Sequence, residues 1–553
     1  MGFEVTHTGE YIEVYLASVN IQADSTKVVD VLFLITLISI YKRTPEIKNY
    51  AFHEQTMEVT PFCAALALFL FLFHLIKKLL FDGETTSPEM SLPPTPPSLP
   101  VLGHLHHLRK PLHQSLARLS AAHGPLLLLR FGTRRVLCVS SRDIADECFT
   151  TNDLAFAGRP VIPSVRRTSY NYTAIAIATY GPDWRDMRRI ATIEALSGHR
   201  LCFFSDVRAD EARALVRILF RDTAGDGFST VELRPRLFGL AMNVMMRMII
   251  GKRYYGCEAG EAEARRIQQV VQEVISAAGV SNVGDFLPAA IGWIARLGVR
   301  RRLARAHRYR DRLIQGLIDE EKTKRREKED AGEVEKEERP RRTVMDASLL
   351  TAGTDTSSNT IEWALSLLLN QPEKMEKARQ ELDEQIGHGR LLQESDLPNL
   401  PFLHCIINES LRLYPVAPLL VPHQSLEPCK LGGYDIPRGT MLIVNAYVIH
   451  RDPELWPEPA KFLPERFEGG KAEAERMKML PFGRGRRKCP GEALALKEVG
   501  LVLGTLLQCF EWGRVGEDEV GMEEGSGLTM PRVHPLQAMC KPRECMISAL
   551  SQI

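Results

Sequence analysis

The sequence predicts a single large, mainly α-helical domain behind a membrane-spanning segment. Apolar residues recur at helical spacing in long stretches, most clearly at residues 352–368 and 492–503. No linker rich in Pro, Gly or Ser interrupts the sequence after about residue 110. A chain of 553 residues would otherwise suggest roughly three to four domains, so the missing linkers favour one body.

The membrane-spanning segment is predicted within residues 57–81. Residues 61–76 are uncharged, and residues 79–81 lengthen the apolar stretch to about 20 residues, which is enough to cross a bilayer. Lys77 and Lys78 can extend to the interface, and lysines on this side place the following domain in the cytosol. A cleaved signal peptide and a buried core helix are the alternatives, but no small-x-small cleavage site follows.

The segments on either side of this anchor differ in character. Residues 1–56 form an atypical extension, because their only apolar run, Val31–Tyr41, is too short to span a bilayer. Met57, just before the anchor, is an alternative start. The prolines within residues 82–110 predict a stiff hinge. Residues 111–553 are then expected to form the main domain.

Composition excludes some partners. Lys and Arg total 70 against 69 Asp and Glu, so net charge gives no reason to propose nucleic acid as a partner. The 11 cysteines are scattered, odd in number and without a C-x-x-C pair. This pattern fits a reducing compartment better than a disulfide framework.

The most informative segment is residues 482–491, with the pattern F-x-x-G-x-R-x-C-x-G. It fixes five residue types, and a chance match in a chain this long is on the order of 10⁻⁴. Cys489 precedes the helical pattern of residues 492–503, so its sulfur lies near a helix N-terminus. The helix dipole and nearby Arg487 are expected to lower the pKa of the thiol, and the thiolate is a good iron ligand.

The residues around Cys489 suit a flat cofactor. Gly485 and Gly491 allow the backbone to approach a macrocycle, and Phe482 can shield the sulfur. Here the chain resembles the cytochrome P450 superfamily, in which a cysteine thiolate binds haem iron and favours O–O cleavage. The resemblance implies a helix-rich haem domain with a small β-rich lobe, and haem b bound through Cys489.

A second motif, A-G-T-D-T-S, lies at residues 352–357 within a helical pattern. Thr356 can bond back to the carbonyl of Ala352, and Gly353 removes a side chain from the same groove, so the helix can open locally. A flexible turn is the alternative for the motif alone. The resemblance implies a distal helix over the haem, with Thr356 and Asp355 delivering protons during oxygen activation.

A third element is the pair Glu409 and Arg412, which share one helix face at i,i+3. Alone such a pair is worth only about 0.2–0.5 kcal/mol on a surface. The resemblance implies a buried triad with Arg466 of the P-E-R-F segment at residues 464–467. Breaking a buried triad would cost about 3–5 kcal/mol, so these residues are expected to build the haem pocket.

The haem carboxylates need cations and hydrogen-bond donors. Trp184 and Arg188 have the W-x-x-x-R spacing, which puts both on one helical face. By resemblance, these two residues, Arg487 and His423 would meet the carboxylates. Solvated arginines on an amphipathic helix, and a histidine that is merely a satisfied polar residue, are the alternatives.

The resemblance covers nearly everything from Pro93 to Arg543 and is closest to plant microsomal A-type members of the isoflavone-hydroxylase-like group. The stretches that carry it are Asn171–Thr173, Asn243–Met248, Gly432–Gly439 and His450–Pro453. It implies hydroxylation of a small, flat phenolic metabolite. Four segments are expected to line the pocket: residues 161–179, the distal helix, residues 416–421 and residues 526–530.

The resemblance also implies partners and a location. Electrons would come from NADPH through a separate cytochrome P450 reductase, with cytochrome b5 as an optional second partner. Arg484, Arg486 and Lys488 make a plausible docking patch. The chain has no nucleotide-binding glycine fingerprint, which agrees with reduction from outside. The enzyme would be anchored in the endoplasmic reticulum membrane and face the cytosol.

One departure from the family keeps other functions open. The charged run of residues 320–339, expected to be a solvated loop, lies close before Ala352, so part of the distal helix is expected to be missing. Only Val344, Met345, Leu349 and Leu350 offer apolar contacts there. A reductase-independent haem-thiolate isomerase or dehydratase and an inactive haem-binding relative are therefore alternatives to a monooxygenase.

Overall fold

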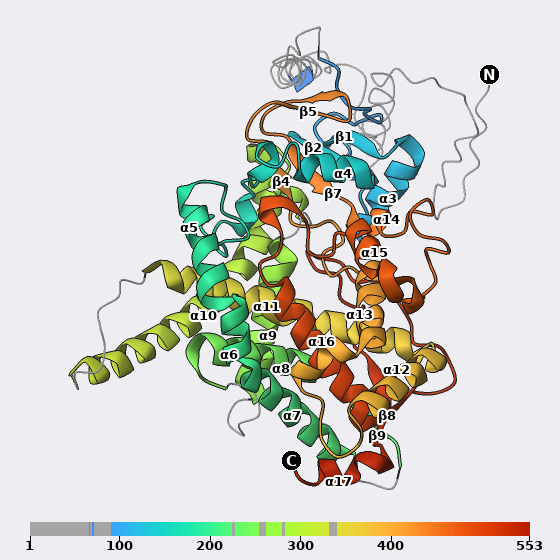
Figure 1. Ribbon diagram of the computed structural model, residues 1–553. Helices are drawn as coiled ribbons and strands as arrows, with labels where there is room; N and C mark the ends of the chain where they lie inside the picture. Colours follow the sequence, from blue (N-terminus) through green and yellow to red (C-terminus); the bar gives the residue numbers. More distant parts are fainter. Residues whose placement is uncertain are drawn as a thin grey trace, which may run out of the picture. The chain divides into compact units, whose positions relative to one another are not determined.

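The computed structural model describes residues 90–223, 227–253, 261–278, 282–330 and 340–553, together with Leu66, Phe69 and Leu70. The chain divides into two compact units, Met1–Glu89 and Met90–Ile553. The second unit is mainly helical, as predicted, and contains the elements discussed below (Figure 1). Within these ranges, no helix has both the length and the apolar character needed to cross a membrane. The predicted anchor, residues 57–81, lies outside them apart from the three isolated residues.

The helices form most of the second unit. Those that the structure describes are α3 (Leu112–His123), α4 (Arg142–Phe149), α5 (Pro182–Ile190), α6 (Gly198–Phe203), α7 (Ser205–Asp222), α8 (Arg234–Ile250), α9 (Glu261–Ala278), α10 (Ala289–Asp330), α11 (Pro340–Leu369), α12 (Pro372–Gln385), α13 (Pro401–Leu413), α14 (Ala446–Ile449), α15 (Ala472–Lys478), α16 (Glu492–Cys509) and α17 (Ile547–Leu550).

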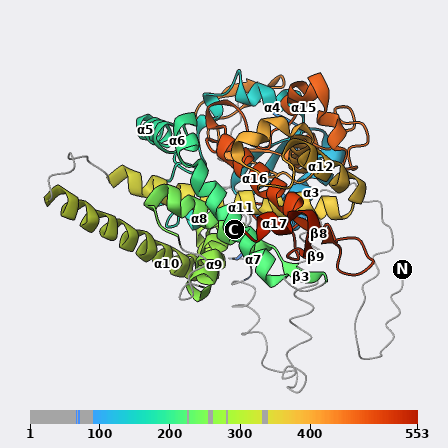
Figure 2. The same ribbon diagram turned by 60° about the horizontal axis from the view of Figure 1, so that its bottom comes forward.

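Helix α11 organises the core. It packs against α8, α13 and α16, as Figure 2 shows for α8 and α16. Ile361, Leu365 and Leu368 of α11 are fully buried in one apolar cluster with Leu503 and Leu506 of α16. Removing this apolar surface from water is the main stabilising contribution to the fold. It also fixes the distal motif relative to the helix that follows Cys489.

The strands form a smaller β-rich lobe and two accessory sheets. The main sheet has the order β1-β2-β7-β4, with β1 (Leu126–Phe131), β2 (Arg134–Val139), β7 (Met441–Val444) and β4 (His423–Gln424). Strands β1 and β2 pair antiparallel, β2 and β7 pair parallel. The other sheets are β3-β9-β8 (Ser229–Glu232, Gln537–Pro542, Phe510–Gly513) and β5-β6 (Cys429–Leu431, Tyr434–Ile436). The pairing of β4 with β7 brings His423 to the edge of the main sheet.

The described part of the proline-rich segment, from residue 90 on, makes contacts with this lobe. The backbone of Ser91 bonds with Asp435, and the carbonyl of Pro94 accepts from the backbone of Leu128. The carbonyl of Pro96 accepts from buried His104. These contacts place the unit boundary after residue 89, about twenty residues earlier than the sequence suggested.

The region before the distal motif also differs from expectation. Helix α10 extends to Asp330, so the first half of the charged run at residues 320–339 is helical rather than a loop. Helix α11 begins at Pro340, and Pro is well tolerated in a first helical turn. Leu349 and Leu350 are buried as expected, whereas the side chains of Val344 and Met345 lie outside the described part.

Candidate active site

The loop before α16 positions Cys489. The backbone N–H of Cys489 donates to the carbonyl of Phe482 at 2.8 Å, which closes the loop. Gly485 has φ +67°, and a Cβ there would lie 2.5 Å from Asp153 Oδ1. Gly485 is therefore required because the end of α4 and the residues after it approach its backbone closely. The sequence analysis had assigned this glycine to the approach of a macrocycle. A Cβ on Gly491 would lie 3.8 Å from Cys489 Sγ, so this glycine faces the sulfur.

The Cys489 thiol is partly desolvated by the protein around it. The residue is exposed to solvent, yet surrounding protein raises the pKa of its thiol by burial. The N–H of Gly491 and the charge of Arg188 oppose this shift. The expectation of a lowered pKa is therefore wrong for the protein alone, because desolvation of the thiolate outweighs the helix terminus. A bound metal cation reverses this balance, since a coordinating thiol is deprotonated.

The predicted triad is formed, and it is buried. Arg412 binds Glu409 with two parallel hydrogen bonds of 2.7 and 2.8 Å, and both side chains are fully buried. Arg466 Nε lies 3.3 Å from Glu409 Oε1. The remaining Arg412 donors bond the carbonyls of His450, Pro459 and Lys461. Every N–H of this guanidinium is used, so the pair fixes the chain that leads to the cysteine loop.

His450 links the triad to that loop, a role that sequence reasoning missed. It is fully buried, its Nδ1 lies 3.2 Å from the carbonyl of Arg412, and its Nε2 accepts from the N–H of Leu480 at 2.8 Å. Burial and the charges of Arg451 and Arg412 lower the pKa of His450 to about 3. The ring therefore stays neutral and can donate from one nitrogen and accept at the other. The only sequence signal was the H-R-D-P stretch.

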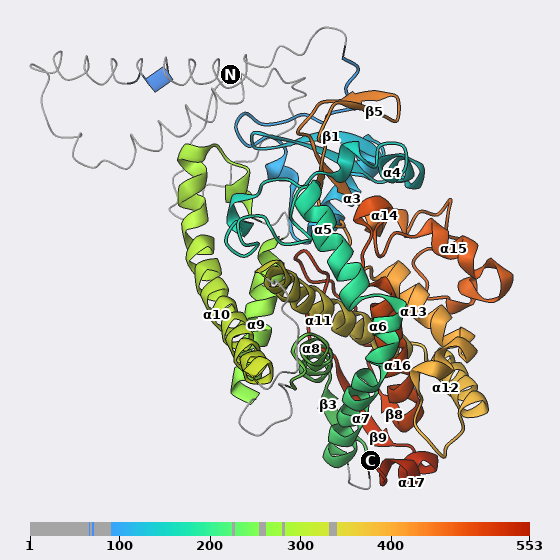
Figure 3. The ribbon, with the colours of Figure 1, turned by 60° about the vertical axis from the view of Figure 1, so that its left-hand side comes forward.

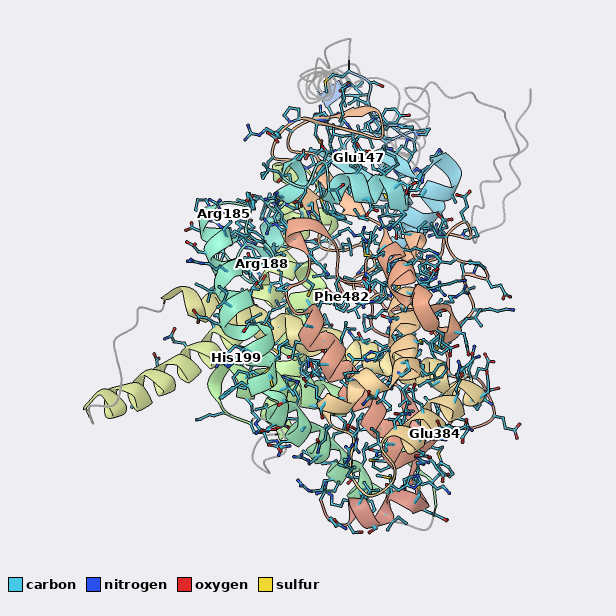
Figure 4. The ribbon with its side chains drawn as sticks, viewed as in Figure 1. Glu147, Arg185, Arg188, His199, Glu384 and Phe482 are labelled. Carbon is cyan, nitrogen blue, oxygen red and sulfur yellow. The ribbon has the colours of Figure 1, made fainter. Side chains whose placement is uncertain are left out.

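Four cationic or potentially cationic side chains gather near this loop. Arg159 donates to the carbonyls of Val421 and Pro422, and Arg487 donates to those of Ala157 and Ala178. Arg188 donates to the carbonyl of Lys488, one residue before Cys489. His423 is buried and bonds the carbonyl of Phe156 through Nδ1. These four residues are the cationic cluster. Figure 4 labels Arg188 of this cluster and Phe482 of the cysteine loop.

The cationic cluster fits a dianionic group. No carboxylate among the described residues offsets the charges of Arg159, Arg188 or Arg487, and burial lowers the pKa of all three. Arg159 Nε and Arg487 Nη1 are buried without a hydrogen-bond partner. Uncompensated buried charge is costly, and two carboxylates would remove that cost. The residues present therefore fit haem, with Arg159 as a member that the sequence analysis did not identify.

His423 can donate to such a carboxylate only if it gains a proton. A carbonyl can only accept, so Nδ1 carries the hydrogen in the bond to Phe156, and neutral Nε2 is an acceptor. Burial, followed by the charge of Arg159, lowers the pKa of His423 well below its usual range. A carboxylate beside Nε2 would raise that pKa again.

Trp184 supports the cationic cluster differently from expectation. Its indole N–H donates to the carbonyl of Ile175 at 3.0 Å, so this donor is not directed at a haem carboxylate. The Arg487 guanidinium lies over the Trp184 ring, with its Cζ atom 4.1 Å from the ring centroid. Trp184 therefore helps to hold Arg487 through a cation–π contact.

The distal motif adopts the predicted back-bonded helix. Thr356 Oγ1 donates to the carbonyl of Ala352 at 2.7 Å, and residues 340–369 remain helical throughout. The sequence analysis expected α11 to open locally at this motif, but the helix is continuous there. A Cβ on Gly353 would lie 2.6 Å from the sulfur of Met245, so this glycine makes room for α8 rather than for a groove.

Asp355 lies on another side of α11 from Thr356. Its Oδ2 accepts from Thr529 Oγ1 at 2.9 Å and from Asn359 Nδ2 at 3.0 Å. The carboxyl is buried, and desolvation raises its pKa. Asp355 therefore connects the distal helix to the turn at residues 526–530.

The buried carboxyl group of Glu498 connects α16 to α11. Ser357, the neighbour of Thr356, donates to Glu498 Oε2 of α16 at 2.9 Å. Glu498 is fully buried, and desolvation raises its pKa to about 7. Its Oε1 and the Nη1 of buried Arg208 on α7 both lack partners. Glu498 thus ties α16 to α11 in a form that is easily protonated.

The expected pocket segments come together. One apolar cluster contains Ile175 of residues 161–179, Leu350 of α11, Leu494 of α16 and Leu528 of the turn at residues 526–530. The N–H of Met530 donates to the carbonyl of Val416 at 2.8 Å, which adds residues 416–421 to the same wall. These contacts connect all four segments.

The predicted docking patch is largely neutralised. Arg484 pairs with Asp146, Arg486 pairs with Asp153, and Lys488 pairs with Glu492, at 2.6–2.7 Å. Arg185 on neighbouring α5 is exposed and has no carboxylate partner in the described part of the chain. The free positive charge on this face thus lies on α5 rather than in the cysteine loop.

Comparison with known proteins agrees with this geometry. The family model for cytochrome P450 matches residues 93–536. The chain belongs to the cytochrome P450 family. This P450 is 46% identical to cytochrome P450 81Q32 of Catharanthus roseus over 84% of its own length and 94% of the relative. It therefore acts as a cytochrome P450 monooxygenase, and the family implies haem as its cofactor.

Other similar proteins include named enzymes. The P450 is 44% identical to an isoflavone 3'-hydroxylase of Medicago truncatula, over 82% of this chain and 92% of that one. It is 42% identical to (+)-piperitol/(+)-sesamin synthase of Sesamum radiatum, over 90% and 99%. A solved zebrafish P450 structure with abiraterone superposes with a TM-score of 0.64 at 26% identity, covering 78% of this chain and all of the other.

Proposed function

We propose that Cys489 ligates the iron of haem b and that the cationic cluster holds the two haem carboxylates. The observation that carries this proposal is the set of cations without carboxylate partners among the described residues, two of them with buried unpaired donors, next to the Cys489 loop. When bound, haem supplies the activation of O2 and the insertion of one oxygen atom into a C–H bond. The triad and His450 hold the cysteine loop in place for this chemistry.

Proton supply is the proposed task of Thr356 and Asp355. The Thr356 hydroxyl bonds only a carbonyl of its own helix, so it can rotate to serve another acceptor. Burial raises the pKa of the Asp355 carboxyl and favours its protonated form, so this group can take part in proton transfer. Thr529 is the next hydroxyl on that side.

Electrons would come from NADPH through a separate reductase, as is typical of the family. We place the docking face on α5, where Arg185 is free to attract an acidic partner. The apolar stretch at residues 57–81 supports a single-pass anchor in the endoplasmic reticulum membrane, with the catalytic unit in the cytosol.

The substrate class is proposed to be a small, flat phenolic such as an isoflavonoid or lignan. Relatives named for isoflavone hydroxylation and sesamin synthesis support this class. The apolar wall of Ile175, Leu350 and Leu528 suits a flat ring system.

The test is turnover of the full-length protein with a plant NADPH–cytochrome P450 reductase. Isoflavones and lignans are offered beside a terpene of similar size. We expect a thiolate-type carbon monoxide spectrum and NADPH-dependent oxygenation of a phenolic. Conversion of organic peroxides without NADPH would instead indicate an isomerase, and oxidation of the terpene alone would overturn the substrate class.

A further inference from the structure

The turn at residues 526–530, part of the expected pocket wall, is fixed to the protein at its last residue. The N–H of Met530 donates to the carbonyl of Val416 at 2.8 Å, and the carbonyl of Met530 accepts from the indole N–H of Trp363 at 2.9 Å. Met530 is also almost completely buried. This end of the turn is therefore held by α11 and by the segment that follows α13.

The tip of the turn, residues 526–529, is held much less firmly. The Thr529 hydroxyl donates to Asp355 Oδ2 at 2.9 Å, and within the described part of the chain this is the only hydrogen bond of the tip. Leu528, the neighbour of Thr529, packs in the apolar cluster of the pocket wall. A displacement of Leu528 would therefore act directly on the bond between the tip and Asp355.

The position of the Asp355 carboxyl depends on this bond. Its other donor is Asn359 of the same helix, 3.0 Å from the same oxygen, Oδ2. Arg234 of α8, which lies beside α11 (Figure 3), attracts the carboxyl but is paired with Glu362 at 2.9 Å. Among the described residues, Thr529 is thus the only hydrogen-bond partner of this carboxyl from outside α11.

The bond to Thr529 also keeps Asp355 away from Thr356. Consecutive residues of an α-helix are about 100° apart around its axis, so the two side chains leave α11 in different directions. Asp355 is buried against the turn, whereas Thr356 is half-buried and bonds the carbonyl of Ala352. Turning the carboxyl toward Thr356 would break its bond to Thr529.

We propose that Thr529 is a positioning residue that holds Asp355 away from Thr356 until a ligand in the pocket displaces the tip. Such a ligand would press on Leu528, separate Thr529 from Asp355 and free the carboxyl to turn toward Thr356. It would favour the displaced tip because it fits the pocket better in that arrangement. The inference rests on the proposed proton role of Asp355 and Thr356, and it adds control of that role by an occupied pocket.

The first test is Thr529→Val, because valine has nearly the shape of threonine but no hydroxyl. Asn359 still donates to the carboxyl in this variant, so the fold is expected to persist. With haem and the reductase but without ligand, the variant should consume NADPH several-fold faster than the parent, because the carboxyl is already free. Thr529→Ser keeps the donor and should behave like the parent. Equal NADPH consumption in Thr529→Val and the parent would overturn the proposal.

The second test is the infrared band of the Asp355 carboxyl in the haem-loaded protein, assigned by its loss in Asp355→Asn. A hydrogen bond polarises the carboxyl, so losing the bond to Thr529 should shift the band. We expect the shift in Thr529→Val without ligand, and in the parent when the isoflavone daidzein binds. An unchanged band in either case would overturn the proposal. If daidzein gives no binding spectrum, the proposed substrate class is wrong, and the ligand-free measurements decide the inference.

Two controls separate positioning from loosened packing. Thr529→Val combined with Asp355→Asn should lose the extra NADPH consumption, because Thr529 acts through Asp355; persistence of the extra consumption would refute the proposal. Thr505→Val removes another buried hydroxyl, which donates to the carbonyl of Leu501 on α16, and should leave both readouts unchanged. Asp355→Asn with an unchanged product yield per NADPH would instead remove the proton role of Asp355 itself.

Discussion

The triad region and the loop at residues 168–172, which packs against α10, differ in how completely their polar groups are bonded and in backbone strain. In the triad region every N–H of Arg412 is bonded, and the Glu409–Arg412 pair is fully buried. In the loop, Tyr170, Asn171 and Tyr172 are consecutive residues with φ of 50°, 57° and 65°. This left-handed conformation costs about 1–2 kcal/mol per residue for side chains other than glycine.

The contacts of that loop are also incomplete. Tyr170 packs edge to face on His307 of α10, and Arg310 donates to the carbonyl of Thr168. Tyr170 OH, His307 Nδ1 and Arg310 Nε are nevertheless buried without partners. The Arg412 guanidinium at the centre of the triad is thus fully bonded, whereas the loop expected to line the substrate pocket is strained. Strain of this kind concentrates at sites that change conformation or select ligands.

The largest expected effect is on the cofactor side. Cys489→Ser should abolish the thiolate-type spectrum of the ferrous carbon monoxide complex, because a neutral hydroxyl is a poor iron donor. Cys202→Ser, at an exposed position away from the loop, is the control and should keep the spectrum. An unchanged spectrum in the first variant would remove Cys489 as the ligand.

The triad should rank next. Glu409→Gln leaves Arg412 buried without a counter-charge, which costs about 3–5 kcal/mol of unfolding free energy and should reduce haem retention. Arg466→Gln should cost less, because Arg466 is partly exposed and its 3.3 Å contact is longer. Denaturant unfolding and haem content measure both. Equal losses would show that the triad acts as one unit and not as a central pair with a weaker third member.

The contact between α11 and α16 at Glu498 can be tested by the pH dependence of stability. Its pKa is about 7 when folded and 4.5 in the reference state, so the folded protein binds the extra proton. Stability should therefore fall as pH rises from about 4.5 to 7, by about 3 kcal/mol in total. Glu498→Gln should remove this loss. Melting temperatures at several pH values measure it, and a pH-independent difference between variant and parent would contradict it.

Thr356→Ala should affect chemistry more than stability. Haem should stay bound while more of the NADPH consumed appears as hydrogen peroxide, because proton supply is impaired. Thr360→Ala is the matched control, since Thr360 makes the same kind of bond to the carbonyl of Thr356. If product formed per NADPH is unchanged in Thr356→Ala, the proton role is wrong.

The smallest effect is expected in the strained loop. Asn171→Gly should raise stability by about 1 kcal/mol or less, because glycine adopts a positive φ without steric cost. Asn171→Val should lower it, since a β-branched side chain is poorly tolerated there. Thermal unfolding compares the two. A gain for Val, or no difference, would mean that the loop is not strained as described.

Local patterns in the sequence predicted three features of the cofactor side. The cysteine loop, the Glu409–Arg412 pair and the back-bond of Thr356 each depend on residues a few positions apart, so their spacing determines their geometry. The helical fold with a β-rich lobe followed from the family that those motifs indicate. Arg466, the member of the triad that is distant in sequence, was correctly predicted through the P-E-R-F segment.

Tertiary structure alone decided what depends on burial and on distant partners. Desolvation by the surrounding protein reversed the predicted pKa shift of Cys489. Arg159 joined the cationic cluster, and Gly485 and Gly353 proved to accommodate protein neighbours, α4's end and Met245. A sequence pattern reports which side chains share a face of one element, whereas charge balance and desolvation depend on which elements meet.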